Sequence, residues 1–227
     1  MLKTLFRFSF ISFIIFFIGC TPRVIAPPPP QYLEQELSLE ELVEKVGSDI
    51  EVLKAITYIK IEKNNKPYDV FSASVLVKRP GWLHMRIYKF GMLVKDFVIK
   101  DRELYVLSGK GSDNLKKLGN EFYNAIFWWD DLRDGIMQRQ GDEYVVRSDK
   151  KEIHLDSATL LPVKQEIIAY NRTIDITYDK PVKTEDGLWY SSEMEIYIGE
   201  FKFTVTLKKL MKNPSLGEFD FITPARI

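Results

Sequence analysis

Short segments that alternate apolar and polar residues, joined by brief turns, constrain the fold of this chain most strongly. The segments are rich in Val, Ile, Tyr and Phe. Such alternation is typical of strands with one buried face, and the close spacing leaves no room for the crossover helices that parallel strands need. The pattern therefore predicts an antiparallel sheet built from hairpins. Strands are expected at about 55–64, 67–78, 81–90, 92–100, 102–108, 135–139, 143–148, 151–155, 163–170, 173–179, 187–198 and 200–210.

Two segments in the same region show helical periodicity instead. The first is expected over 38–54, where Ser38 and Glu41 form a capping box at its start. The second is expected over 115–132 and carries an unusually apolar, aromatic stretch that includes Trp129. A helix inserted between strands has to lie over one face of the sheet or at its end.

The predicted sheet is large enough to leave its apolar face incompletely covered. About a dozen strands make a sheet that curls, and each helix covers a strip roughly 10 Å wide. Either a hydrophobic cavity remains or large side chains fill the space as a packed core. The fold class is mainly β (α+β), a single large curved antiparallel sheet or incomplete β-barrel closed by two or more helices. Candidate cavity residues are Leu83, Met85, Ile87, Phe97, Phe122, Ile126, Trp129, Phe201, Phe203, Val205 and Leu207.

The N-terminal region carries the only cysteine, Cys20, at the end of an apolar run. Lys3 and Arg7 precede that run, and Gly19 and Cys20 close it in a pattern that resembles a bacterial lipobox. We expect residues 1–19 to be a signal peptide and Cys20 to carry a diacylglycerol and an N-acyl group. No other cofactor is expected.

Three other interpretations of this N-terminal region are possible. A transmembrane anchor needs about 20 apolar residues, and this run is nearer a dozen. A simple secretory signal lacks its usual small-x-small cleavage site here. A buried structural cysteine is a common role, but the position of Cys20 at the end of the run disfavours it.

Residues 20–37 read as a tether between the lipidated cysteine and a folded domain at 38–227. Pro27, Pro28, Pro29 and Pro30 are consecutive, which favours an extended polyproline II spacer. A proline-rich recognition ligand is the alternative. The chain is expected to end in a short extended segment at 217–224.

Charge and motif content disfavour several function classes. The 32 basic and 32 acidic residues balance, which gives no electrostatic basis for binding nucleic acid. Neither a metal site nor catalysis is expected, because His84 and His154 are scattered, and His84 is expected on the surface. Asp130 and Asp131 are expected to end the second helix and remain in solvent.

The order of several motifs resembles the LolA/LolB-like lipoprotein-carrier superfamily. A strand ends in Arg79-Pro80-Gly81, further strands follow through Phe90-Gly91 to 104–107, a helix occupies 115–132, and a phenylalanine-rich phrase closes the chain at 219–224. The resemblance covers most of 38–224. It implies an incomplete antiparallel barrel whose open side is covered by helices. The barrel and helices would enclose an apolar cavity that accepts acyl chains. The membrane-anchored LolB-type members are themselves lipoproteins, in agreement with Cys20.

Two functional hypotheses follow from these observations. The first is a non-catalytic lipoprotein that binds or transfers acyl chains or lipoproteins, anchored in a bacterial outer membrane and facing the periplasm. Thr21 after the cysteine suggests that destination. Its expected partners are the membrane, the acylated cargo and a periplasmic carrier or envelope complex. The second is a structural or assembly lipoprotein of an envelope complex whose cavity is filled or vestigial.

Overall fold

The computed structural model describes residues 28–31, 37–47, 49–130, 132, 134–169 and 172–223. Cys20, the expected signal peptide at 1–19 and most of the expected tether lie outside these residues. The predictions about them therefore stay predictions. Within the described part of the chain, no helix is long and apolar enough to cross a membrane.

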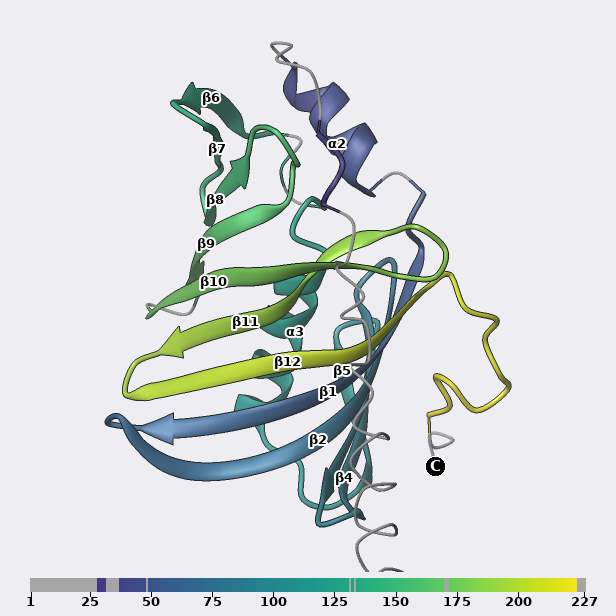
Figure 1. The fold of residues 1–227 in the computed structure, drawn as a ribbon. Helices are drawn as coiled ribbons and strands as arrows, with labels where there is room; N and C mark the ends of the chain where they lie inside the picture. The colour runs from purple at the N-terminus through teal and green to yellow at the C-terminus, as the bar shows by residue number, and fades with distance from the viewer. Residues whose placement is uncertain are drawn as a thin grey trace, which may run out of the picture.

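Twelve antiparallel strands form one open sheet, which confirms the predicted fold class (Figure 1). Their order is β5-β4-β3-β2-β1-β12-β11-β10-β9-β8-β7-β6, so the first and last strands pair in the middle. The strands are β1 (Val52–Lys63), β2 (Lys66–Lys78), β3 (Trp82–Lys89), β4 (Met92–Lys100), β5 (Glu103–Ser108), β6 (Ile136–Gln140), β7 (Glu143–Arg147), β8 (Lys151–Asp156), β9 (Pro162–Ala169), β10 (Arg172–Lys183), β11 (Trp189–Ile198) and β12 (Phe201–Lys212).

The first predicted helix is shorter than expected. Helix α2 spans Leu39–Gly47, and the capping box is present, with the Ser38 amide donating to Glu41 Oε2 at 2.8 Å and the Glu41 amide to Ser38 Oγ at 3.2 Å. The predicted continuation to residue 54 is wrong. Residues from Val52 onward belong to β1, because this segment pairs with both β2 and β12 and the two ladders override its helical spacing.

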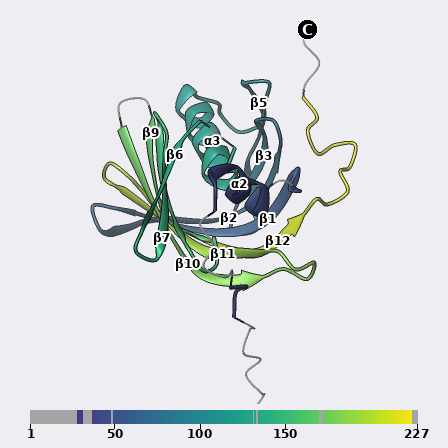
Figure 2. The ribbon, with the colours of Figure 1, turned by 90° about the horizontal axis from the view of Figure 1, so that it is seen from above.

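The second predicted helix also ends early. Helix α3 spans Asp113–Ile126, and the following residues to Asp130 form turns. In chain order α3 lies between β5 and β6, the two edge strands of the sheet. The chain therefore has to cross the open side of the curve, and Figure 2 shows α3 lying there.

Close contact between α3 and the sheet removes most free volume beneath the helix. A Cβ atom at Gly119 would lie 2.3 Å from Ile99 Cδ1 and 3.1 Å from a Leu83 methyl carbon. The helix backbone thus touches the apolar side chains of β3 and β4 directly. Beneath Gly119 the concave face is therefore filled by the protein's own side chains, and Leu83 and Ile99 are both fully buried.

The C-terminal segment returns across the outer face of β3, which the sequence did not predict. His84 is only 3% exposed. Its Nδ1 lies 2.6 Å from the Asp220 carbonyl oxygen and its Nε2 lies 2.7 Å from Asp96 Oδ1. The prediction that His84 is a surface residue is therefore wrong. The expected extended segment is also wrong, because residues 218–221 form turns.

Candidate functional site

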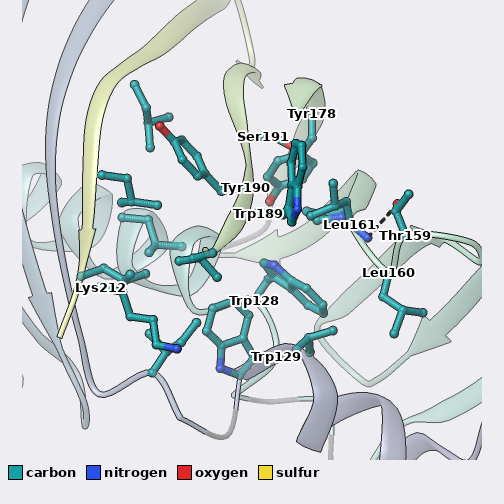
Figure 3. A pocket seen from close by; sticks show the side chains of 18 of the residues that line it. Trp128, Trp129, Thr159, Leu160, Leu161, Tyr178, Trp189, Tyr190, Ser191 and Lys212 are labelled. Atoms are coloured by element: carbon teal, nitrogen blue, oxygen red, sulfur yellow. Dashed lines mark hydrogen bonds between the residues drawn. The ribbon is translucent and has the colours of Figure 1, made fainter. Parts of the chain in front are cut away.

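A cavity of about 360 Å³ opens at the end of the sheet where α2 lies (Figure 3). It lies between α2, the turns after α3 and the inner faces of the central strands. Its volume falls within the usual range of about 300–1,000 Å³ for ligand pockets. Its buried wall consists of Ile50, Leu53, Ala125, Trp128, Trp129, Leu160 and Met194.

Aromatic side chains line two sides of this cavity. Trp128 and Trp129 come from the turns after α3, and their rings meet edge to face with centroids 5.2 Å apart. Across the cavity lie Trp189 and Tyr190 from β11 and Tyr178 from β10 (Figure 3). Flat rings supply large apolar contact area at low entropic cost, so these walls suit an apolar guest.

The arginine of the Arg79-Pro80-Gly81 turn holds two walls of the cavity together. Its Nη1 donates to the Gly47 carbonyl at the end of α2 at 3.2 Å, and its Nη2 pairs with Asp130. The guanidinium also lies 5.4 Å from the centre of the Phe127 ring. The prediction that Asp130 remains in solvent is therefore wrong, because its carboxylate forms a largely covered ion pair with Arg79.

Buried polar groups beneath α3 support the end of this helix. Lys151 Nζ donates to the Trp128 carbonyl at 3.2 Å. The Tyr178 hydroxyl donates to Gln165 Oε1 at 2.5 Å and lies 3.4 Å from the Ala125 carbonyl. Burial raises the pKa of Tyr178 far above its usual value, so the hydroxyl stays protonated as a donor. Lys151 thus satisfies a carbonyl in the turn that follows α3, and the Tyr178 hydroxyl lies close to one of the last carbonyls of the helix, which have no partner within it.

Charged and polar residues gather at the mouth of the cavity. Lys45, Asp49 and Asp186 line the cavity and are solvent-exposed. Lys212 Nζ pairs with the Asp49 carboxylate. Polar atoms are thus concentrated where the cavity meets solvent, and the buried wall is mainly apolar.

Only three of the predicted cavity residues line this cavity: Ile126, Trp129 and Leu207. The other eight predicted residues are either buried or partly buried. Leu83, Met85, Phe97 and Val205 belong to the buried core, and Ile87, Phe122 and Phe203 are partly buried against it. Phe201 is partly buried beside Phe203, with ring centroids 6.3 Å apart. Whether any of them contacts an acyl chain stays a prediction.

Several lining residues were missed by the sequence reading. Leu53 was assigned to a helix rather than to an inward strand position. Trp128 was recognised as apolar but not placed at the cavity. Other buried or partly buried residues that line the cavity and were not predicted there include Ile50, Leu160, Tyr178, Leu188, Trp189, Tyr190, Met194 and Leu210. Inward spacing on β11, where Met194 and Ile196 are both buried, could have identified Met194. Leu210 is out of step with the inward positions up to Leu207, because the pairing of β12 with β1 shifts register after that residue.

No group of three or more potential metal ligands occurs in the described part of the chain. Among the polar side chains that line the cavity, Tyr178 donates to Gln165, Thr159 donates to Asp156 and Lys212 pairs with Asp49. The arrangement can bind an apolar molecule with a polar end at the mouth.

No protein-family model matches the sequence, and no curated protein matches it. Solved structures that share its architecture include the following two. A LolA superfamily protein from Nitrosomonas europaea has a TM-score of 0.59 and 13% identity, covering 82% of this chain and 96% of its own. A DUF1329 family protein from Desulfovibrio piger has a TM-score of 0.54 and 14% identity, covering 81% and 94%. The predicted LolA/LolB-like fold is confirmed.

Proposed function

We propose that this LolA/LolB-like domain is the soluble part of a membrane-anchored lipoprotein that binds or transfers acyl chains or acylated lipoproteins. The anchor would be the lipid on Cys20, and the location would be the outer membrane, facing the periplasm. The observation that carries the proposal is an apolar cavity open at one end of the sheet. No covalent chemistry is involved.

The distribution of polarity in the cavity suits an amphipathic guest. Leu53, Met194 and Trp128 form a buried apolar wall. Each methylene that moves from water to such a wall contributes about 0.8 kcal/mol. The charged residues Lys45 and Asp186 lie at the mouth, where a polar head would stay in water. An acyl chain would enter with its hydrocarbon end first.

Titration with a fluorescent fatty acid tests this proposal. Met194→Trp would narrow the cavity, because Met194 is 8% exposed and lies on its wall. Met92→Trp is the matched control, since Met92 is 65% exposed on β4. We expect at least about tenfold weaker binding for Met194→Trp, equivalent to about 1.4 kcal/mol, and unchanged binding for the control. Unchanged binding in a folded Met194→Trp variant would contradict the proposal.

The assembly-subunit hypothesis has one observation in its favour. The hairpin between β3 and β4 exposes Phe90 by 90% and Met92 by 65%, and Leu93 and Val94 by 44% each. Exposed apolar patches mark sites of protein or membrane contact. Phe90→Ser separates the two functions, because it leaves the cavity intact. Loss of cellular function with normal fatty-acid binding would favour the assembly role.

A further inference from the structure

The mouth of the cavity is defined by the lining residues that are exposed to solvent. These come from three places in the chain: the proline-rich segment before α2, the helix with its following loop, and the turn between β10 and β11. They are Pro30, Lys45, Asp49, Asp186 and Gly187. The proline-rich segment thus forms one edge of the opening.

The position of Pro30 limits how far the mouth can lie from the anchor. Pro30 lies ten positions after Cys20, and ten fully extended residues span at most about 36 Å. The strand ends opposite the mouth lie farther than this from the mouth. Strand β2 has 13 residues, which corresponds to roughly 43 Å of length. A lipid on Cys20 would therefore stay within about 36 Å of the mouth, a shorter distance than the length of β2.

The mouth also has side chains that favour a membrane surface. Trp189 and Tyr190 are only partly buried and line the opening beside the β10–β11 turn. Lys183 Nζ lies 6.0 Å from the centre of the Trp189 ring. Tryptophan and tyrosine are enriched at membrane interfaces, where one end of the ring system is apolar and the other is wet.

We propose that the mouth faces the membrane in which the chain is anchored and that the guest enters the cavity directly from that membrane. This inference rests on the proposed function and on lipidation at Cys20. Direct entry has a physical advantage: an acyl chain that crosses water loses about 0.8 kcal/mol for each exposed methylene. If the mouth of the cavity contacts the bilayer, the acyl chain can enter without first being exposed to water.

The test measures which end of the domain approaches the bilayer. The full lipidated chain is reconstituted in vesicles of phosphatidylethanolamine and phosphatidylglycerol that include a lipid with a spin-labelled headgroup. One variant, Glu185→Cys, places a fluorescent dye in the β10–β11 turn beside the mouth. The matched variant, Lys66→Cys, places it at the start of β2, at the opposite strand ends. Both positions are exposed, and the acylated Cys20 would not react with the dye.

We expect the spin label to quench the Glu185→Cys dye several-fold more strongly than the Lys66→Cys dye. Equal quenching, or stronger quenching at Lys66→Cys, would overturn the inference. Fatty-acid binding is measured on the same two samples. If both bind the fatty acid but show no difference in quenching, only the orientation is wrong. If neither binds it, the proposed function fails as well. Failure of the chain to associate with vesicles would overturn the anchoring on which the inference rests.

Discussion

Gly47 packs against the indole ring of Trp129, and a Cβ atom at Gly47 would lie 2.1 Å from Trp129 Nε1. Gly47 is the last residue of α2, and Trp129 follows α3 in the chain. This contact therefore joins the two segments that cover one end of the sheet. No larger residue than glycine fits without displacing the tryptophan from the cavity wall.

Gly47→Ala should destabilise the protein although alanine is the better helix former. Overpacking of a core contact typically costs about 1–3 kcal/mol, and the free energy of unfolding in urea measures it. Gly217→Ala is the control, because its nearest atom would lie at 3.6 Å, an ordinary contact distance. Equal urea midpoints for the two variants would show that the Gly47–Trp129 contact is not tight.

Arg79→Met should also lower the free energy of unfolding. It leaves the Asp130 carboxylate and the Gly47 carbonyl without their guanidinium partner, and such losses typically cost about 1–3 kcal/mol each. Lys180→Met removes an exposed ion pair with Glu193 and should cost less than about 1 kcal/mol. A similar loss in both variants would contradict the structural role assigned to Arg79.

Lowering the pH should reduce the free energy of unfolding, in part because Glu152 becomes protonated. Hydrogen bonds from Arg147 and then from His154 hold the pKa of Glu152 below its usual value. A lowered folded-state pKa means that the stabilisation is present above the unfolded pKa and is lost as the pH falls through the folded value. Glu152→Gln should therefore flatten the decline in the free energy of unfolding between neutral and acidic pH. The pair is substantially exposed, so the difference should be about 0.5 kcal/mol or less. An identical pH slope in both proteins would contradict this assignment.

His84→Leu should release the C-terminal segment from the outer face of β3. The ring lies between the Asp220 carbonyl and the Asp96 carboxylate, both of which accept hydrogen bonds, and leucine offers no donor to either. Limited proteolysis within residues 213–223 should become several-fold faster. His154→Leu is the control, since His154 bonds only Glu143 and Glu152 in the described structure. Unchanged cleavage in His84→Leu would mean that other contacts hold the segment.

The strand pattern predicted the sheet because pairing and burial both follow the local alternation of residues. The alternation of Phe203, Val205 and Leu207 predicted the inner face of β12 correctly, because Val205 belongs to the buried core and Phe203 and Leu207 pack against it. Helix ends were less predictable. Leu53 fits both the helical spacing of the preceding segment and an inward strand position, and only the pairing of β1 with two neighbours decides between them.

The cavity was harder to predict because it depends on where two helices lie over the sheet. Leu83 and Phe97 have the inward spacing expected of cavity residues, yet both are fully covered. Gly119 lets α3 approach β3 and β4 closely enough to cover these inward residues. The free volume therefore lies at the other end, among residues that separate elements bring together. Local periodicity carries no information about that placement.

Native mass spectrometry of the full chain, released from mild detergent after incubation with a fatty acid, tests the central claim most directly. An apolar cavity that holds one guest predicts a single added fatty acid per chain, beyond any acyl groups attached to Cys20. The addition should persist in Met92→Trp and be lost in Met194→Trp. A wild-type chain that shows no bound fatty acid, or a Met194→Trp variant that binds as much as the wild type, would contradict the account.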